Sequence, residues 1–132
     1  MLLALTTVPM AAGIIAYIFG RKSHKLRDYF ADAVTAAELI VLIILSYQAL
    51  SGRNVVYSAR ELCGLGISLK LDGFRIVYGL VAAFMWAMTP IFSREYMEHY
   101  PRTNRFYMFF LITLGATVGV FLSADLFTTF MF

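Results

Sequence analysis

The feature that most constrains this chain is an apolar run over residues 106–132. A single helix over these 27 residues would be ~40 Å long, whereas the hydrocarbon core of a bilayer is ~30 Å thick. Ser123 and Asp125 interrupt the run shortly before the last apolar residues. We therefore predict a membrane-spanning helix over 106–122, a turn, and the start of a further helix within 125–132.

The composition agrees with a membrane protein. Hydrophobic residues make up 61% of the 132 residues and charged residues 14%, more apolar surface than a small water-soluble domain can bury. The net charge of +3 does not indicate nucleic-acid binding, because the basic residues are distributed among the predicted loops. One cysteine excludes an internal disulfide and a cysteine metal cluster.

Three further apolar segments have the length of a membrane span: 2–20, 29–50 and 73–96. The first has no basic residues before its apolar core, so it reads as a retained helix with its N-terminus outside. The sequence thus predicts an all-α integral membrane protein. We expect one membrane domain, 1–132, with four spanning helices and the start of a fifth.

Between the second and third helices, residues 51–72 are polar and contain two strand-like pieces, 54–59 and 67–72. We predict a small external β-hairpin here. Asp72 is expected to cap the third helix and Asp125 the last one, because a carboxylate can accept backbone N–H groups at a helix start. Arg75 either reaches the outer interface or pairs with Asp72.

The loop charges predict the orientation. Seven of the 11 basic residues fall in the segments 21–28 and 94–105, and four fall between residues 51 and 75. By the positive-inside rule, loops 21–28 and 94–105 are cytoplasmic and read as solvated surface loops, while the hairpin is external. The basic residues on the first side are Arg21, Lys22, Lys25, Arg27, Arg94, Arg102 and Arg105; those on the second are Arg53, Arg60, Lys70 and Arg75.

Glu38 lies well inside the second apolar segment. A charged side chain at the centre of a membrane helix costs at least ~2.5 kcal/mol on insertion scales, so it normally faces protein or water and has a function. We consider two interpretations: Glu38 takes part in ion translocation, or it is a neutral residue hydrogen-bonded to a neighbouring helix. Asp32, nearer the end of the segment, is expected to reach the interface.

Small residues mark a packing face on the fourth helix. Gly115 and Gly119 form a G-x-x-x-G pair, which Ser123 extends, and such a stripe allows close helix approach in a membrane. We find no histidine cluster, no Ser/His or Cys/His pair and no glycine-rich phosphate loop. The sequence therefore predicts no catalytic residue, metal site or cofactor.

Several short stretches resemble a known family. They are Asp72-Gly73, Tyr96, Asn104-Arg105-Phe106-Tyr107 and the segment 119–127, GVFLSADLF. From about Lys70 onward the chain is similar to the N-terminal part of antiporter-like proton-translocating subunits. These subunits occur in respiratory complex I, Mrp-type antiporters and membrane-bound [NiFe] hydrogenases.

The resemblance implies a larger fold with a lysine- and glutamate-based proton path and a hairpin that links neighbouring subunits. The family's key glutamate would follow Phe132, so no functional residue is transferred to this chain. Because the last apolar segment is too short to span a membrane, we expect the N-terminal part of a longer subunit or a split-gene product.

The predicted function is that of a membrane subunit in a redox-driven or cation/proton antiporter complex of a prokaryotic cell (inner) membrane. It would contribute to translocation of H⁺ or Na⁺ beside other membrane subunits. Two alternatives are a self-contained four-helix proton-coupled transporter and a purely structural assembly subunit.

Overall fold

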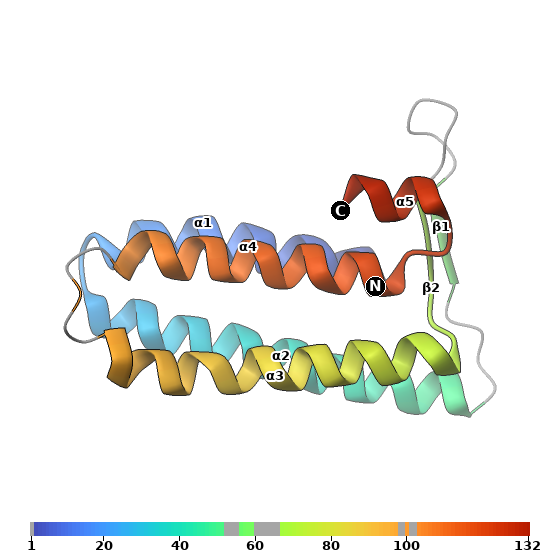
Figure 1. Ribbon diagram of the computed structural model, residues 1–132, viewed down its shortest axis with the longest axis horizontal. Coiled ribbons are helices and arrows are strands. Elements are labelled where there is room, and N and C mark those ends of the chain that lie inside the picture. The colour runs from blue at the N-terminus through green and yellow to red at the C-terminus, as the bar shows by residue number, and fades with distance from the viewer. Residues whose placement is uncertain (1, 52–55, 60–66, 98–99, 101–102) are drawn as a thin grey trace.

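The computed structural model describes residues 2–51, 56–59, 67–97, 100 and 103–132. Four long helices run side by side, with two short strands across one end of the bundle and a short helix beside that end (Figure 1). The elements are, in chain order, α1 (Leu2–Gly20), α2 (His24–Leu50), β1 (Val56–Ala59), β2 (Ile67–Lys70), α3 (Gly73–Met97), α4 (Thr103–Leu122) and α5 (Leu126–Met131).

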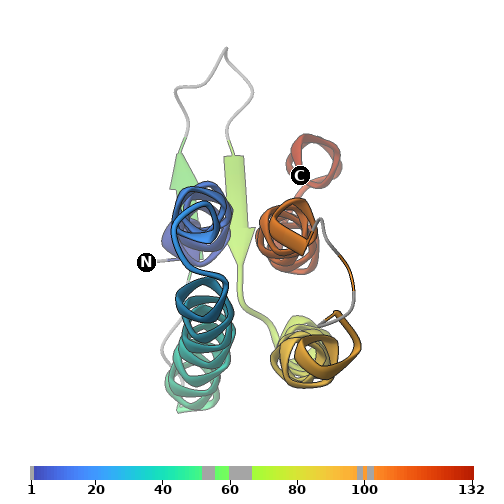
Figure 2. The same cartoon turned by 90° about the vertical axis from the view of Figure 1, so that its left-hand side faces the viewer.

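The four long helices form two stacked pairs. Seen along the helix axes, α1 and α2 lie on one side of the bundle and α4 and α3 on the other (Figure 2). The most extensive contact joins α1 to α4, followed by the contact between α2 and α3. Helices that are neighbours in the sequence, α1 with α2 and α3 with α4, also pack together.

Each long helix is long and apolar enough to cross a bilayer. They contain 19, 27, 25 and 20 residues, and no more than 44% of the most apolar window of any of them is buried inside the protein. Large apolar side chains such as Ile14, Phe84 and Phe92 are exposed on the outside of the bundle. In water this surface would be unfavourable, whereas lipid or neighbouring helices cover it at no such cost. The chain is a multi-pass membrane protein.

Glycines allow α1 and α4 to approach closely. A Cβ atom added to Gly13 would lie 2.8 Å from the carbonyl oxygen of Met108. From the other helix, a Cβ added to Gly115 would collide with the backbone oxygen of Thr6 and lie 2.6 Å from Cγ of Met10. Larger side chains at these positions would push the two backbones apart, so the close approach of α1 and α4 depends on small residues from both helices.

Helix α2 begins five residues earlier than the hydrophobic pattern predicts, at His24 and not at residue 29. Ser23 occupies the N-cap position in an extended conformation, and its carbonyl accepts the N–H of Arg27 at 3.3 Å. The predicted solvated loop 21–28 is therefore largely helical, and Arg27 within it is buried. Helix α4 likewise starts at Thr103, three residues before the predicted position.

The strands β1 and β2 are antiparallel, with Val56 opposite Lys70 and Ala59 opposite Ile67. Residues 60–66, which the predicted hairpin includes, lie outside the described part. The strand β2 also holds the turn between α4 and α5: the N–H of Ala124 donates to the carbonyl of Ser68 at 2.8 Å. In return, the N–H of Ser68 donates to the hydroxyl of Thr128 at 3.0 Å, so α5 starts against the strand.

Candidate functional site

Glu38 lies at the middle of the membrane-spanning part of the fold. It is the fifteenth of the 27 residues of α2, and only 6% of its surface is exposed. The buried residues Ala31, Thr35, Glu38 and Leu42 recur at spacings of four, three and four, which places Glu38 on the inward stripe of the helix. Glu38 is thus buried because it lies on the face of α2 that packs against the other helices.

Glu38 lines a small apolar groove of about 210 Å³ between α1 and α2. The other lining residues are Ala4, Leu5, Val8, Val34, Ala37 and Val41. Among the residues that the structure describes, the Oε1 atom of Glu38 is buried and has no hydrogen-bond partner. A buried polar atom of this kind is costly unless another group satisfies it.

The hydroxyl groups on the same face of α2 differ from Glu38 in this respect. Thr35 donates to the carbonyl oxygens of Ala31 and Asp32, both at 3.1 Å. Ser46 donates to the carbonyl of Leu42 at 2.7 Å. These hydroxyls are satisfied by their own helix, whereas Oε1 of Glu38 has no hydrogen-bond partner among the described residues.

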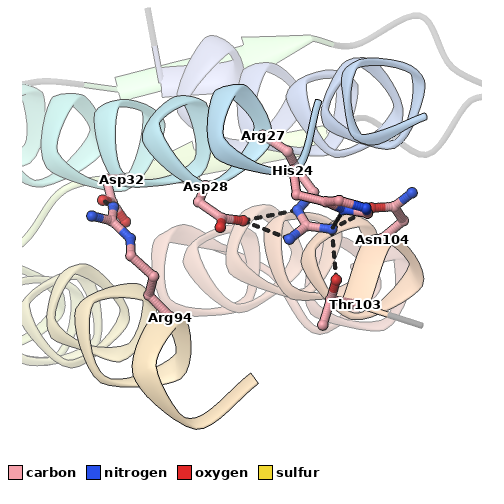
Figure 3. A network of polar contacts seen from close by, with 7 residues as sticks. All are labelled: His24, Arg27, Asp28, Asp32, Arg94, Thr103 and Asn104. Atoms are coloured by element: carbon pink, nitrogen blue, oxygen red, sulfur yellow. Dashed lines mark hydrogen bonds and ion pairs between the residues drawn. The ribbon is translucent and has the colours of Figure 1, made fainter. Parts of the chain in front are cut away.

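A second polar region lies at the end of the bundle where α1 connects to α2. Its centre is Arg27, which is 2% exposed (Figure 3). Its Nε and Nη2 atoms donate to Oδ1 of Asp28 at 2.9 and 2.6 Å, and Nη1 donates to the hydroxyl of Thr103 at 2.8 Å. Nη1 also donates to Oδ1 of Asn104, and the guanidinium lies 4.6 Å from the ring centre of Tyr107.

An ion pair joins α2 to α3 near the same end. Nη2 of Arg94 contacts Oδ2 of Asp32, and the guanidinium of Arg94 lies 4.8 Å from the ring centre of Tyr29. Within the described part of the chain, Oδ1 of Asp32 and Nε of Arg94 are buried without partners. Asp32 was expected to reach the interface, and Arg94 to lie in a surface loop. The expectation for Arg94 is wrong, because Arg94 belongs to the last turn of α3 and pairs with Asp32. The location of Asp32 at the membrane interface stays a prediction.

A cavity of about 630 Å³ lies beside these contacts. Its lining is mixed in charge and polarity and comes from α2, α3, Tyr100 and the start of α4: His24, Lys25, Arg27, Asp28, Ile91, Arg94, Glu95, Met97, Tyr100, Thr103 and Tyr107. Sequence reasoning missed this region because the basic residues fit a solvated loop. The spacing of the residues could have revealed it. Arg27 lies four residues before Ala31 and eight before Thr35, so it falls on the same buried face of α2.

The two predicted caps, Asp72 and Asp125, lie at the starts of α3 and α5. The carboxylate of Asp72 pairs with Arg75 at 2.5 Å and with Lys70 at 3.1 Å. Of the two alternatives considered for Arg75, the structure shows the pair with Asp72. The backbone oxygen of Asp72 accepts the N–H of Ile76 at 2.8 Å, as the N-cap residue of a helix does, and side-chain capping by Asp72 stays a prediction. Asp125 occupies the N-cap position of α5, yet its side chain makes no capping hydrogen bond. Extended backbone and the β2 contacts position this turn instead.

Gly115, Gly119 and Ser123 do not share one packing partner. Gly115 faces α1, whereas a Cβ atom at Gly119 would lie 2.6 Å from the ring of Phe132. Ser123 lies beyond the end of α4, where its hydroxyl donates to the carbonyl of Val120 at 2.7 Å and contacts that of Thr129 at 2.5 Å. The groove beside Glu38 is lined by α1 and α2 and includes none of these three residues.

No family model matches this chain. It is 29% identical over 122 residues to the A/B component of a probable K⁺/H⁺ antiporter from Rhizobium meliloti, covering 90% of this chain and 12% of that protein. It is 26% identical over 120 residues to the A1 component of a Na⁺/H⁺ antiporter from Staphylococcus haemolyticus, covering 89% of this chain and 15% of the relative. The chain therefore spans less than a sixth of the length of these two relatives.

A solved structure has the same fold. A chain of the membrane-bound sulfane sulfur reductase, an archaeal respiratory membrane complex, superposes with a TM-score of 0.81 at 24% identity. The match covers 99% of this chain and 20% of the other. The predicted resemblance to antiporter-like membrane subunits is thus confirmed over nine-tenths of the sequence.

Proposed function

Because this chain is similar to a segment of cation/proton antiporter subunits, we propose that it is the N-terminal part of such a protein, working in a multisubunit membrane complex. The observation that carries the proposal is the similarity over 90% of the chain to the A/B component of a K⁺/H⁺ antiporter. The relatives are named for K⁺/H⁺ and Na⁺/H⁺ exchange, which supports H⁺ or Na⁺ as the transported ion. The partners are other membrane subunits.

Within this function, we propose that Glu38 takes part in ion translocation. Its position halfway along α2 places a carboxyl group near the depth at which an ion crossing the bilayer meets the highest electrostatic barrier. A carboxyl group can take up and release H⁺ or coordinate Na⁺ through its oxygens. The unpartnered Oε1 atom supports this role over that of a satisfied packing residue.

The proposed orientation places the N-terminus and the strands outside the cell. The connection from α1 to α2 and the facing ends of α3 and α4 lie at one end of the bundle, and the strands lie at the other (Figure 1). This arrangement supports a cytoplasmic location for the basic segments 21–28 and 94–105, under the positive-inside rule. A cysteine at Lys22 should then react with an impermeant maleimide only from the cytoplasmic side, and one at Ser51 only from outside.

The test of the function is Glu38→Gln in the intact complex, assayed as cation-driven proton movement in inverted membrane vesicles. The amide keeps the shape of the side chain but cannot exchange a proton, so we expect at least a tenfold loss of rate with normal assembly. Glu95→Gln, the same chemical change at an exposed position, is the matched control and should leave the rate unchanged.

Two outcomes would favour the alternatives. A wild-type transport rate in the Glu38→Gln complex would show that Glu38 is not needed for transport, which would favour the structural assembly subunit. Proton-coupled transport by the purified 132-residue chain alone in liposomes would support the self-contained transporter.

A further inference from the structure

Strand β2 forms hydrogen bonds along both of its edges. One edge pairs with β1 in an antiparallel register. On the other edge, the carbonyl of Ser68 accepts the N–H of Ala124 at 2.8 Å, and the N–H of Ser68 donates to the hydroxyl of Thr128 at 3.0 Å. Leu69 also pairs with Ser123 in an antiparallel bridge. The turn that follows α4 and the first turn of α5 thus take the place of a third strand beside β2.

Thr128 is the residue that attaches α5 to this edge. It is fully buried, whereas Leu126 and Phe130 of the same helix are 90% and 89% exposed. All six residues of α5 are described, and Thr128 is the one that is buried. Its hydroxyl oxygen satisfies the N–H of Ser68, which would otherwise need an acceptor from a neighbouring strand. The attachment of α5 to the strands therefore depends on one side chain.

Arg75 holds the same turn from α3. Its Nε atom donates to the carbonyl of Ser123 at 3.0 Å, one residue beyond the end of α4 at Leu122. A cation is favourable there, because the last carbonyl groups of a helix lack partners within the helix and carry partial negative charge. Nη1 of Arg75 pairs with Asp72 at 2.5 Å, and Asp72 pairs with Lys70 of β2 at 3.1 Å. These contacts join β2, the start of α3 and the end of α4.

We propose that β2, Thr128 and Arg75 form a clasp that couples α5 to the pair of strands and sets the angle between α4 and α5. Thr128 fastens α5, and Arg75 is a positioning residue that acts through the backbone of Ser123. A displacement of the strands would then move the start of α5 with them, because Ser68 makes two of the hydrogen bonds. The inference does not rest on the proposed function, and its test measures no ion movement.

Backbone amide hydrogen exchange of the protein in lipid nanodiscs tests the role of Thr128. Thr128→Val keeps the shape of the side chain and removes the acceptor, so the N–H of Ser68 should exchange at least about tenfold faster than in the wild type. Thr128→Ser keeps the acceptor and should restore the rate to within about threefold. Thr129→Val is the matched control, because the hydroxyl of Thr129 contacts Ser123 and Asp125 and not β2. A wild-type rate at Ser68 in Thr128→Val, or an equal increase in Thr129→Val, would overturn the proposal.

The N–H groups of Ala124 and Ser68 report whether the clasp opens as one unit. In Thr128→Val both should exchange faster by the same factor, because both bonds break in a single opening. The N–H of Leu114, buried in the middle of α4, is the internal reference and should exchange at the wild-type rate. Faster exchange at only one of the two groups, or an equal increase at Leu114, would show that no such unit exists.

Arg75→Gln tests the positioning residue. Loss of the bond to Ser123 should accelerate exchange at both Ser68 and Ala124 by at least about threefold. Arg21→Gln, the same change at an exposed position at the other end of the bundle, should leave both rates unchanged. Wild-type rates in Arg75→Gln would overturn the positioning role of Arg75, whatever the outcome of the transport assays.

Discussion

Arg27 of α2 donates a hydrogen bond of 2.8 Å to the hydroxyl of Thr103, which opens α4, although 76 residues separate the two in the sequence. The same guanidinium contacts Asp28 and Asn104 and lies over the ring of Tyr107. It thereby joins the start of α2 to the start of α4 and explains why both helices extend beyond their apolar segments.

Replacing Arg27 with alanine should destabilise the protein by about 3 kcal/mol, because Asp28, Thr103 and Asn104 lose their partner in a buried site. Arg27→Lys should have an intermediate effect, since an ammonium group cannot reproduce the two-sided hydrogen bonding of a guanidinium. Unfolding of the purified protein in mixed detergent micelles measures the difference. Lys22→Ala removes an exposed charge from the same turn and should change stability by less than about 0.5 kcal/mol.

The Asp32–Arg94 pair should couple α2 to α3. Both side chains are partly exposed, 28% and 39%, so a coupling free energy of about 0.5–1 kcal/mol is expected. In a double-mutant cycle with Asp32→Asn and Arg94→Gln, the double variant should be less destabilised than the sum of the single variants. Additive losses would show that the two residues do not stabilise each other.

Gly115 should tolerate no side chain, because Thr6 and Met10 of α1 occupy the space that a Cβ atom needs. Gly115→Ala is expected to cost about 1–3 kcal/mol by overpacking, and Gly115→Leu more. Gly73→Ala is the matched control: a Cβ atom there meets no atom within 4 Å, and alanine favours a helix. A thermal unfolding series in one detergent compares the three variants, and equal melting temperatures for Gly115→Ala and Gly73→Ala would contradict the close contact of α1 with α4.

Some of the site could be predicted from the sequence and some could not. Glu38 stood out because a carboxylate within an apolar span needs a reason, and the structure places it on the buried face of α2. Its groove could not be predicted, because Ala4 and Val8 come from a different helix and nothing in their local sequence marks them. Asp125 illustrates the opposite error: its position at the helix start was right, but the expected side-chain hydrogen bond is missing.

The sequence by itself determined the number of spanning helices and where their apolar parts lie, because bilayer thickness sets a minimum length for an uninterrupted apolar run. The bounds of α1 and the end of α4 at Leu122 follow from this rule. Only the tertiary structure decided that Arg27 contacts Thr103 of α4 and that Arg94 pairs with Asp32 of α2, so that neither is a solvated loop charge. The physical reason is that a guanidinium at a helix end can bind water or a carboxylate with similar ease, and its choice depends on which helices pack beside it.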